Sequence, residues 1–155
     1  MQKVFPVQPM VRAALAWLAA EMAILGLPAS LAPAWFHAWF PFGRGWVLST
    51  GSLNEHTVAD FGYLAVGLSI VLAWAAIRPA PELCRAVLVA ALVVNVSHAA
   101  YHLSHGGELP VADTVVQNGL LILATVINAG ALVMLTRRSA SELTSSSAVT
   151  GSPGT

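Results

Sequence analysis

Four long apolar segments, separated by polar or proline-rich connections, dominate the chain. They run from about residue 11 to 31, 58 to 77, 84 to 103 and 111 to 135. About 20 residues of helix, rising about 1.5 Å each, cross the roughly 30 Å hydrocarbon core of a bilayer. Each segment is therefore long enough to span a membrane. Because no water is available there to satisfy backbone groups, each is predicted to be helical.

Proline and glycine indicate where these helices end. Two prolines within residues 78–81 separate the second segment from the third, since proline lacks an amide donor and disfavours helix at the preceding residue. Gly106 and Gly107 follow the third segment, and Pro110 suits the first turn of the fourth. Short connections make the last three helices antiparallel neighbours. The predicted fold is all-α, an antiparallel four-helix membrane bundle formed by residues 1–138.

The basic residues predict how this bundle is oriented. If the N-terminus is cytoplasmic, only Arg44 falls on the outer side. The other basic residues then lie inside: Lys3, Arg12, Arg78, Arg85, Arg137 and Arg138. Because cytoplasmic loops carry an excess of positive charge, both termini are predicted to be cytoplasmic. Residues 139–155 are mostly small and polar, and are predicted to form a disordered cytoplasmic tail.

The first segment has a second interpretation. Lys3 and Arg12 precede its apolar run and small residues lie near Ala29, as in a cleaved secretory signal peptide. The apolar run is long for the core of a signal peptide, and cleavage would leave three spanning helices. We therefore favour a retained membrane helix.

The connection between the first and second segments is the longest, and it is rich in aromatic residues. Its rings belong to Trp35, Phe36, His37, Trp39, Phe40, Phe42 and Trp46. Rings with an apolar body and a polar edge favour the headgroup layer, so this extracytoplasmic segment is expected to lie along the membrane surface or to cover the mouth of the bundle. An interfacial anchor is favoured over a lid.

The composition supports a membrane protein and excludes several functions. Of the 155 residues, 57% are hydrophobic and 9% are charged, against about 25% charged in a typical soluble domain. The formal net charge of zero gives no electrostatic basis for binding nucleic acid. The single cysteine, Cys84, excludes an internal disulfide and a multi-cysteine metal site. No glycine-rich phosphate loop or nucleophile-elbow motif is present.

Histidines form a stripe near the outer end of the third predicted helix. His98, His102 and His105 are four and three residues apart, with Asn95 on the same stripe one turn deeper. Exposing an ionisable side chain to lipid costs a few kcal/mol. The stripe is therefore predicted to face the interior of the bundle or water.

The second and fourth helices present polar groups at the same end. His56 and Asp60 are four residues apart, as are Asp113 and Gln117, and Glu55 precedes His56. The three polar faces are predicted to meet in one pocket at the outer mouth of the bundle, beneath the aromatic connection.

Imidazoles and carboxylates on facing helices are typical of zinc or non-haem iron sites in bundles. The predicted metal ligands are His56, Asp60, His98, His102 and His105, with Asn95 and Gln117 orienting them. No standard metalloenzyme motif is present, so the identity of the metal stays open. Haem is a second option, with His56 and either His98 or His102 as its axial ligands.

The same residues also suit functions without a metal. A histidine beside a carboxylate can act as an acid–base pair on a small lipophilic substrate, with Glu55, Asp60 and Asp113 as the candidate catalytic carboxylates. Alternatively, these groups cap helices and join them in a non-catalytic subunit that binds a partner membrane protein or a second copy of the chain. The gathering of the whole set at one membrane face favours a functional site.

Glu21 lies apart from this set, near the middle of the first segment. A carboxyl at that depth is costly, so it is expected to face the bundle and to be protonated or paired, with Trp17, Asn128 or Ser69 as candidate partners. It is therefore assigned to proton handling or to packing, outside the predicted site.

The polar residues of the predicted site also resemble the pattern of a protein family. The runs Asn-Glu-His-x-x-x-Asp-x-Gly at residues 54–62 and His-x-x-Tyr-His-x-x-His at residues 98–105 are similar to the pattern of small bacterial four-helix membrane proteins with a DoxX-like layout. Trp46, Asp113 and Gln117 extend the resemblance. It implies a single folded unit in the bacterial cytoplasmic membrane and names no reaction.

Overall fold

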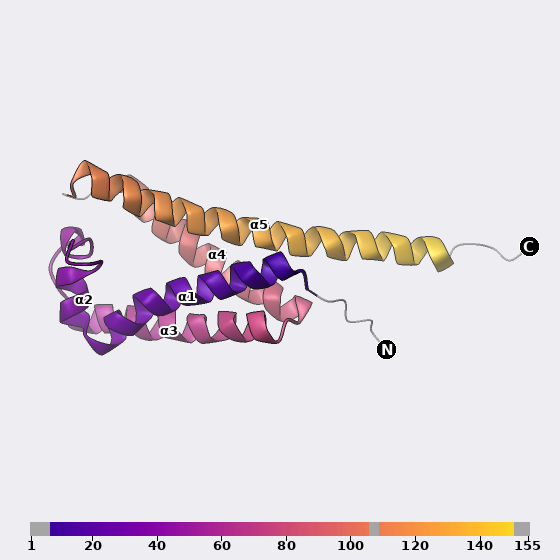
Figure 1. Ribbon diagram of the computed structural model, residues 1–155, viewed down its shortest axis with the longest axis horizontal. Coiled ribbons are helices and arrows are strands. Elements are labelled where there is room, and N and C mark those ends of the chain that lie inside the picture. The colour runs from indigo at the N-terminus through magenta and orange to yellow at the C-terminus, as the bar shows by residue number, and fades with distance from the viewer. Residues whose placement is uncertain (1–6, 106–108, 151–155) are drawn as a thin grey trace, which may run out of the picture.

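The computed structural model describes residues 7–105 and 109–150, and every regular element in them is a helix. In chain order these are α1 (Pro9–Leu31), α2 (Pro33–Trp39), the 3-10 helix η1 (Leu48–Thr50), α3 (Glu55–Ile77), α4 (Pro81–Ser104) and α5 (Val111–Thr150), as Figure 1 shows. The prediction of an all-α fold is confirmed.

Four of the described helices are long and apolar enough to cross a membrane. They are α1, α3, α4 and the part of α5 from Val111 to Arg137. About a third or less of the most apolar window of each is buried inside the protein, so most of their apolar surface faces outward. The chain therefore fits a multi-pass membrane protein.

Helices α1, α3 and α4 begin two or three residues before the predicted apolar segments, because a polar cap or a proline starts each of them. Pro9 and Pro81 occupy the first turns of α1 and α4, where a missing amide hydrogen costs little. The side chain of Asn54 accepts a hydrogen bond of 3.1 Å from the backbone N–H of Thr57 and so caps α3.

At the other end of the chain, the structure differs from the predicted boundary. Helix α5 continues to Thr150, through residues 139–150 of the predicted disordered tail. Residues 151–155, which complete that tail, lie outside the described part of the chain.

Helices α1 and α3 form the closest helix pair, and glycine makes this approach possible. A Cβ atom added at Gly62 would lie 2.4 Å from the backbone nitrogen of Ser30, and one added at Gly26 would lie 2.8 Å from that of Val66. The two backbones are therefore in direct contact, as in other membrane helix pairs with small residues at the interface. The hydroxyl of Ser69 adds a hydrogen bond of 2.8 Å to the carbonyl oxygen of Ala19.

Helices α4 and α5 form the second pair, joined by a buried amide. Asn128 of α5 is fully buried. With its amide turned to satisfy both polar groups, its nitrogen donates to the carbonyl oxygen of Leu88 at 3.1 Å and its oxygen accepts from the N–H of Leu92 at 2.8 Å. A polar side chain thus ties two apolar helices together.

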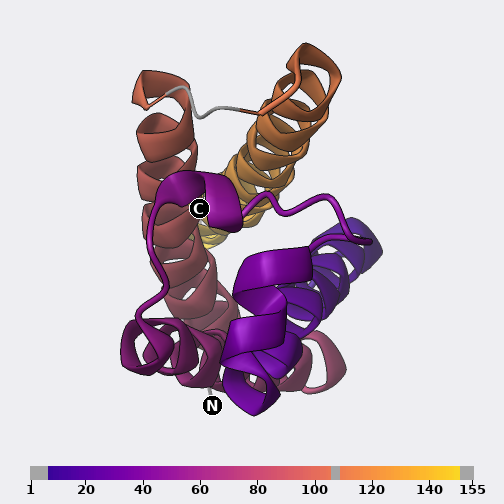
Figure 2. The ribbon, with the colours of Figure 1, turned by 90° about the vertical axis from the view of Figure 1, so that its left-hand side faces the viewer.

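The two helix pairs pack tightly at one end only. The hydrophobic core lies where α1 begins and α3 ends, and Leu15, Leu18, Leu72 and Leu88 are fully buried there. Toward the opposite end, α4 and α5 diverge from α1 and α3 (Figure 1). Helix α2 and the segment that follows it, residues 40–54, lie across this open end (Figure 2). We call residues 40–54 the roof.

The described basic residues separate between the two ends. Arg12 lies in the first turn of α1, Arg78 follows α3 and Arg85 lies in the first turns of α4, at the tightly packed end of the bundle (Figure 1). Arg44 lies in the roof, at the opposite end. This is the asymmetry on which the predicted cytoplasmic position of the termini depends.

Candidate functional site

The open end of the bundle contains a cavity of about 1120 Å³. All four long helices line it, together with α2 and the roof. Its wall is mainly apolar and includes the aromatic side chains of Trp17, Phe36, Phe40, Trp46 and Phe61. Pockets for drug-sized molecules usually measure about 300–1,000 Å³. The cavity is therefore large enough for a molecule of that class.

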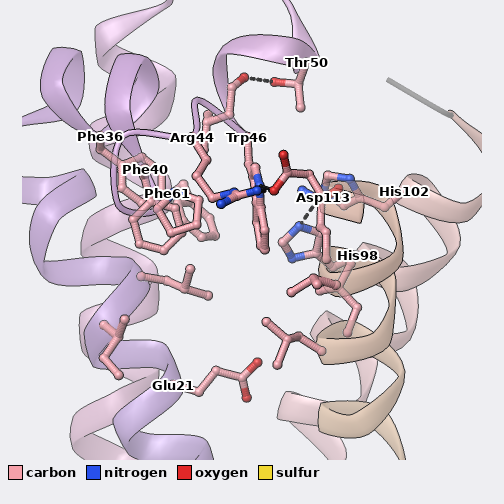
Figure 3. A pocket seen from close by; sticks show the side chains of 18 of the residues that line it. Glu21, Phe36, Phe40, Arg44, Trp46, Thr50, Phe61, His98, His102 and Asp113 are labelled. Carbon is pink, nitrogen blue, oxygen red and sulfur yellow. Dashed lines mark hydrogen bonds and ion pairs between the residues drawn. The ribbon is translucent and has the colours of Figure 1, made fainter. Parts of the chain in front are cut away.

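The roof is attached to α5 through one carboxylate. Asp113 Oδ1 accepts a hydrogen bond from Nε1 of Trp46 at 3.1 Å and forms an ion pair with Nε of Arg44 (Figure 3). The Asp113 side chain is only 8% exposed. The hydrogen bond to Asp113 and the negative charge of that carboxylate raise the pKa of the Arg44 guanidinium above its ordinary value, so the guanidinium stays charged. We call these three residues the clasp.

The backbone of the roof is folded tightly above the cavity. The buried ring of His37 on α2 donates from Nε2 to the carbonyl oxygen of Gly51 at 2.9 Å. The N–H of Trp46 donates to the carbonyl oxygen of Phe40 at 2.8 Å. Gly43 and Gly45 have φ values of 79° and 64°, a conformation that glycine adopts without a steric penalty. These contacts hold Trp46 over the cavity.

Two of the predicted histidines meet at the side of the cavity. His98 and His102 both line it from α4, with their Nε2 atoms 3.0 Å apart (Figure 3). A hydrogen bond between two imidazoles requires a proton on one Nε2 atom and a lone pair on the other. The pair can therefore give up or accept a proton next to a molecule in the cavity.

His105 leaves the predicted stripe because the helix ends before it. Helix α4 ends at Ser104, and His105 has φ −117° and ψ 74°. Its ring is exposed and stacks on Tyr101 with centroids 4.4 Å apart, and it does not line the cavity. Helical spacing therefore predicts its position incorrectly.

His56 and Asp60 form a separate pair on α3. His56 Nε2 lies 3.3 Å from Asp60 Oδ2, and the two side chains are 87% and 52% exposed. Neither residue lines the cavity, and nor does the exposed Glu55. The cause is the rotation of α3, which turns Gly62 toward α1. Asp60 precedes Gly62 by two residues, which corresponds to a rotation of about 200° around the helix. Asp60 therefore lies nearly opposite the face of α3 that contacts α1.

The five predicted metal ligands thus do not converge on one point. His98 and His102 meet at the cavity, His56 and Asp60 form a separate exposed pair, and His105 lies apart from both pairs. Among the described residues, no group of three or more histidine, cysteine, aspartate or glutamate side chains is arranged to hold a metal ion. The two residues predicted to orient the ligands are also separated. Gln117 lines the cavity, whereas Asn95 is buried in α4 and does not line the cavity. Among the described residues, Nδ2 of Asn95 has no hydrogen-bond partner.

Glu21 lines the cavity, although its position in the sequence predicts a place outside the site. Its side chain rises into the inner end of the cavity (Figure 3). Atom Oε2 is buried and has no hydrogen-bond partner among the described residues. Two expected partners bond elsewhere, since Ser69 donates to Ala19 and Asn128 bonds with Leu88 and Leu92. The depth of Glu21 in the first segment was a signal that could have placed it in the site.

The clasp was also missed, although the sequence contains a signal for it. Arg44 is the basic residue assigned to the outer side, and Asp113 is a carboxylate at the outer end of the last helix. Opposite charges on the same side of a membrane bundle are expected to pair, since a charge near lipid is costly without a partner.

Comparison with known proteins provides no further guide to the site. No protein-family model matches the chain, and no curated protein or solved structure matches it either.

Proposed function

We propose that the protein binds a lipophilic small molecule in the cavity, and that the His98–His102 pair exchanges a proton with it. One observation carries this proposal: an apolar cavity of about 1120 Å³ lies between helices of membrane-spanning length and receives His98, His102 and Glu21 (Figure 3). A large apolar pocket with a few converging polar groups is the usual form of a small-molecule site.

The lining supports a lipophilic ligand. Leu25 of α1, Val94 of α4 and Leu120 of α5 line the cavity, and each lies within a span that is apolar enough to cross a membrane. Water in such a space would lose hydrogen bonds, whereas an apolar molecule would lose none. The bilayer also dissolves and concentrates molecules of this kind next to the cavity.

The polar groups support acid–base chemistry on that ligand. The contact of 3.0 Å between the two Nε2 atoms allows one proton to be held between His98 and His102. Proton transfer to or from a reacting group is the commonest catalytic task of histidine. Asp113 has a different role in this proposal, because its Oδ1 atom already binds Arg44 and Trp46 of the roof.

The remaining expectations stay part of the proposal. The cavity opens on the extracytoplasmic side if both termini are cytoplasmic, and the location in a bacterial cytoplasmic membrane and the DoxX-like relationship stay predictions. Binding of zinc or iron also stays a prediction, for which His98 and His102 supply two nitrogen ligands. Elemental analysis of the purified protein tests it.

Ligand binding is tested by thermal unfolding of the protein in mild detergent with N-phenyl-1-naphthylamine, a neutral lipophilic probe. A bound ligand at one hundred times its Kd stabilises the folded state by about 2.7 kcal/mol. We expect a stabilisation of this order for the wild-type protein. Ala20 lines the cavity, so Ala20→Phe fills part of it and should abolish most of the effect.

Ala16→Phe is the matched control for this experiment. Ala16 lies one turn earlier on α1, is exposed, and does not line the cavity. The control should keep the stabilisation seen with the wild-type protein. A probe that fails to stabilise the wild-type protein, or that stabilises Ala20→Phe equally, contradicts binding in this cavity.

A further inference from the structure

We infer that the cavity selects lipophilic cations and that Glu21 is the carboxylate that binds the positive charge. This inference rests on the proposed function, because it names the class of molecule that the same cavity takes. It follows from the charges that line the cavity, the position of Glu21 and the aromatic rings in the cavity wall.

The charges that line the cavity leave one carboxyl group without a counter-ion. Among the described lining residues, the acidic side chains are Glu21 and Asp113, and the one guanidinium is that of Arg44. Arg44 and Asp113 form an ion pair with each other. With the two lining histidines neutral, the formal charge of the lining is therefore −1 once Glu21 is ionised. A ligand with a single positive charge complements it.

The position of Glu21 makes a cationic ligand an effective partner. The carboxyl points into the cavity from its inner end, while the clasp lies at the outer end (Figure 3). Glu21 Oε2 is shielded from solvent and has no hydrogen-bond donor among the described residues. Buried polar groups are nearly always satisfied, and a charged group without a partner is especially costly. A ligand that brings a positive group to this oxygen removes that cost.

Aromatic rings supply the second element of a cation site. Trp17, one helical turn before Glu21, lines the same cavity. Phe36 also lines it, with its ring centroid 4.7 Å from that of Phe40 and 6.4 Å from that of Phe61. The faces of aromatic rings attract cations, tryptophan most strongly, and aromatic cages bind quaternary ammonium groups. Rings and a carboxylate in an apolar space therefore match a bulky organic cation.

The inference is tested with two probes of similar shape and opposite charge, the tetraphenylphosphonium cation and the tetraphenylborate anion. Each is titrated into the wild-type protein in mild detergent, and binding is measured by equilibrium dialysis against protein-free micelles. We expect the cation to bind at least about tenfold more tightly than the anion, which at 25 °C corresponds to about 1.4 kcal/mol. Glu21→Gln, which keeps the shape of the side chain, should reduce cation binding at least about tenfold.

Two controls make the result specific. Glu82→Gln removes an exposed carboxylate at the start of α4, outside the cavity, and should leave cation binding unchanged. Glu21→Gln should still bind neutral N-phenyl-1-naphthylamine, which shows that the cavity is intact. If the neutral probe binds and the cation does not, or if Glu21→Gln keeps the preference for the cation, the inference is wrong and the proposed function stands. If the wild-type protein binds neither the cation nor the neutral probe, the proposed function itself is wrong.

Discussion

The carboxylate of Asp113 links the roof to α5. Its Oδ1 atom pairs with the guanidinium of Arg44 and accepts a hydrogen bond from the indole of Trp46, both in the roof. The side chain of Arg44 is 53% exposed, whereas the side chain of Asp113 is only 8% exposed. Removing the carboxylate therefore leaves Arg44 free to turn into solvent, and the roof loses its link to α5.

Trypsin measures this release directly, because its cleavage site lies within the roof, after Arg44. We expect Asp113→Ala to be cleaved at Arg44 several-fold faster than the wild-type protein, since local opening controls access of a protease to a folded segment. Peptide mapping by mass spectrometry identifies the cleaved bond.

Asp60→Ala is the appropriate control, because Asp60 is an exposed carboxylate of α3 that does not line the cavity. Its cleavage rate at Arg44 should equal that of the wild-type protein. Equal rates for all three proteins would show that the clasp does not hold the roof.

The backbones of α1 and α3 approach each other most closely at two glycines, Gly26 and Gly62. At Gly62 an added Cβ atom would meet the backbone of Ser30 at 2.4 Å, a distance that real Cβ atoms do not show. The helices would have to separate to admit it. Because Trp17 and Glu21 of α1 and Phe61 of α3 line the cavity, the spacing of this pair also sets one wall of the site.

Gly62→Ala should therefore destabilise the protein, although alanine favours helix. Overpacking a closely packed interface typically costs about 1–3 kcal/mol. Thermal unfolding in mild detergent measures the loss. Gly67→Ala, in the same helix, adds a Cβ atom with nothing within 4 Å. It should be neutral or stabilising, by at most about 1 kcal/mol, because glycine is the poorer helix former. Equal effects at the two positions would disprove the proposed contact.

The elements could be predicted from the sequence because the membrane imposes helix on long apolar segments. All four apolar segments lie within described helices, and the differences at their starts come from Asn54 and the two prolines. The closest helix pair could not be predicted from the sequence. Gly26 lies in the first apolar segment and Gly62 in the second, and neither belongs to a spacing pattern that marks a helix interface. It is the meeting of these glycines with backbone atoms that identifies the interface.

The candidate site could be predicted only in part, for reasons that differ between residues. His98, His102, Asp113 and Gln117 line one cavity at one end of the bundle, as the helical spacing indicates. The position of His105 depends on where α4 ends, and the positions of His56 and Asp60 depend on how α3 is rotated. Residue spacing alone predicts neither of these features. Glu21 was placed outside because all the other polar groups lie near helix ends, yet the cavity extends down to its depth.

The molecule as a whole is asymmetric along its long axis. One end is closed by a packed hydrophobic core, and at the other end the two helix pairs diverge around the cavity beneath α2 and the roof (Figures 1 and 2). Such an arrangement keeps four helices together while leaving space for a ligand between them. The central claim is that a lipophilic molecule occupies this space.

Photolabelling tests that claim most directly. The protein, in lipid nanodiscs, is irradiated with a small lipophilic aryl diazirine, with and without excess N-phenyl-1-naphthylamine, and the labelled residues are mapped by mass spectrometry. We predict labels on Glu21, His98 and Trp46, which line the cavity, and loss of these labels when the competitor is present. Labels on exposed residues such as Ile70 and Val126 should not respond to it. Labelling confined to these outward-facing residues, or cavity labels that the competitor leaves unchanged, would contradict a lipophilic site in the cavity.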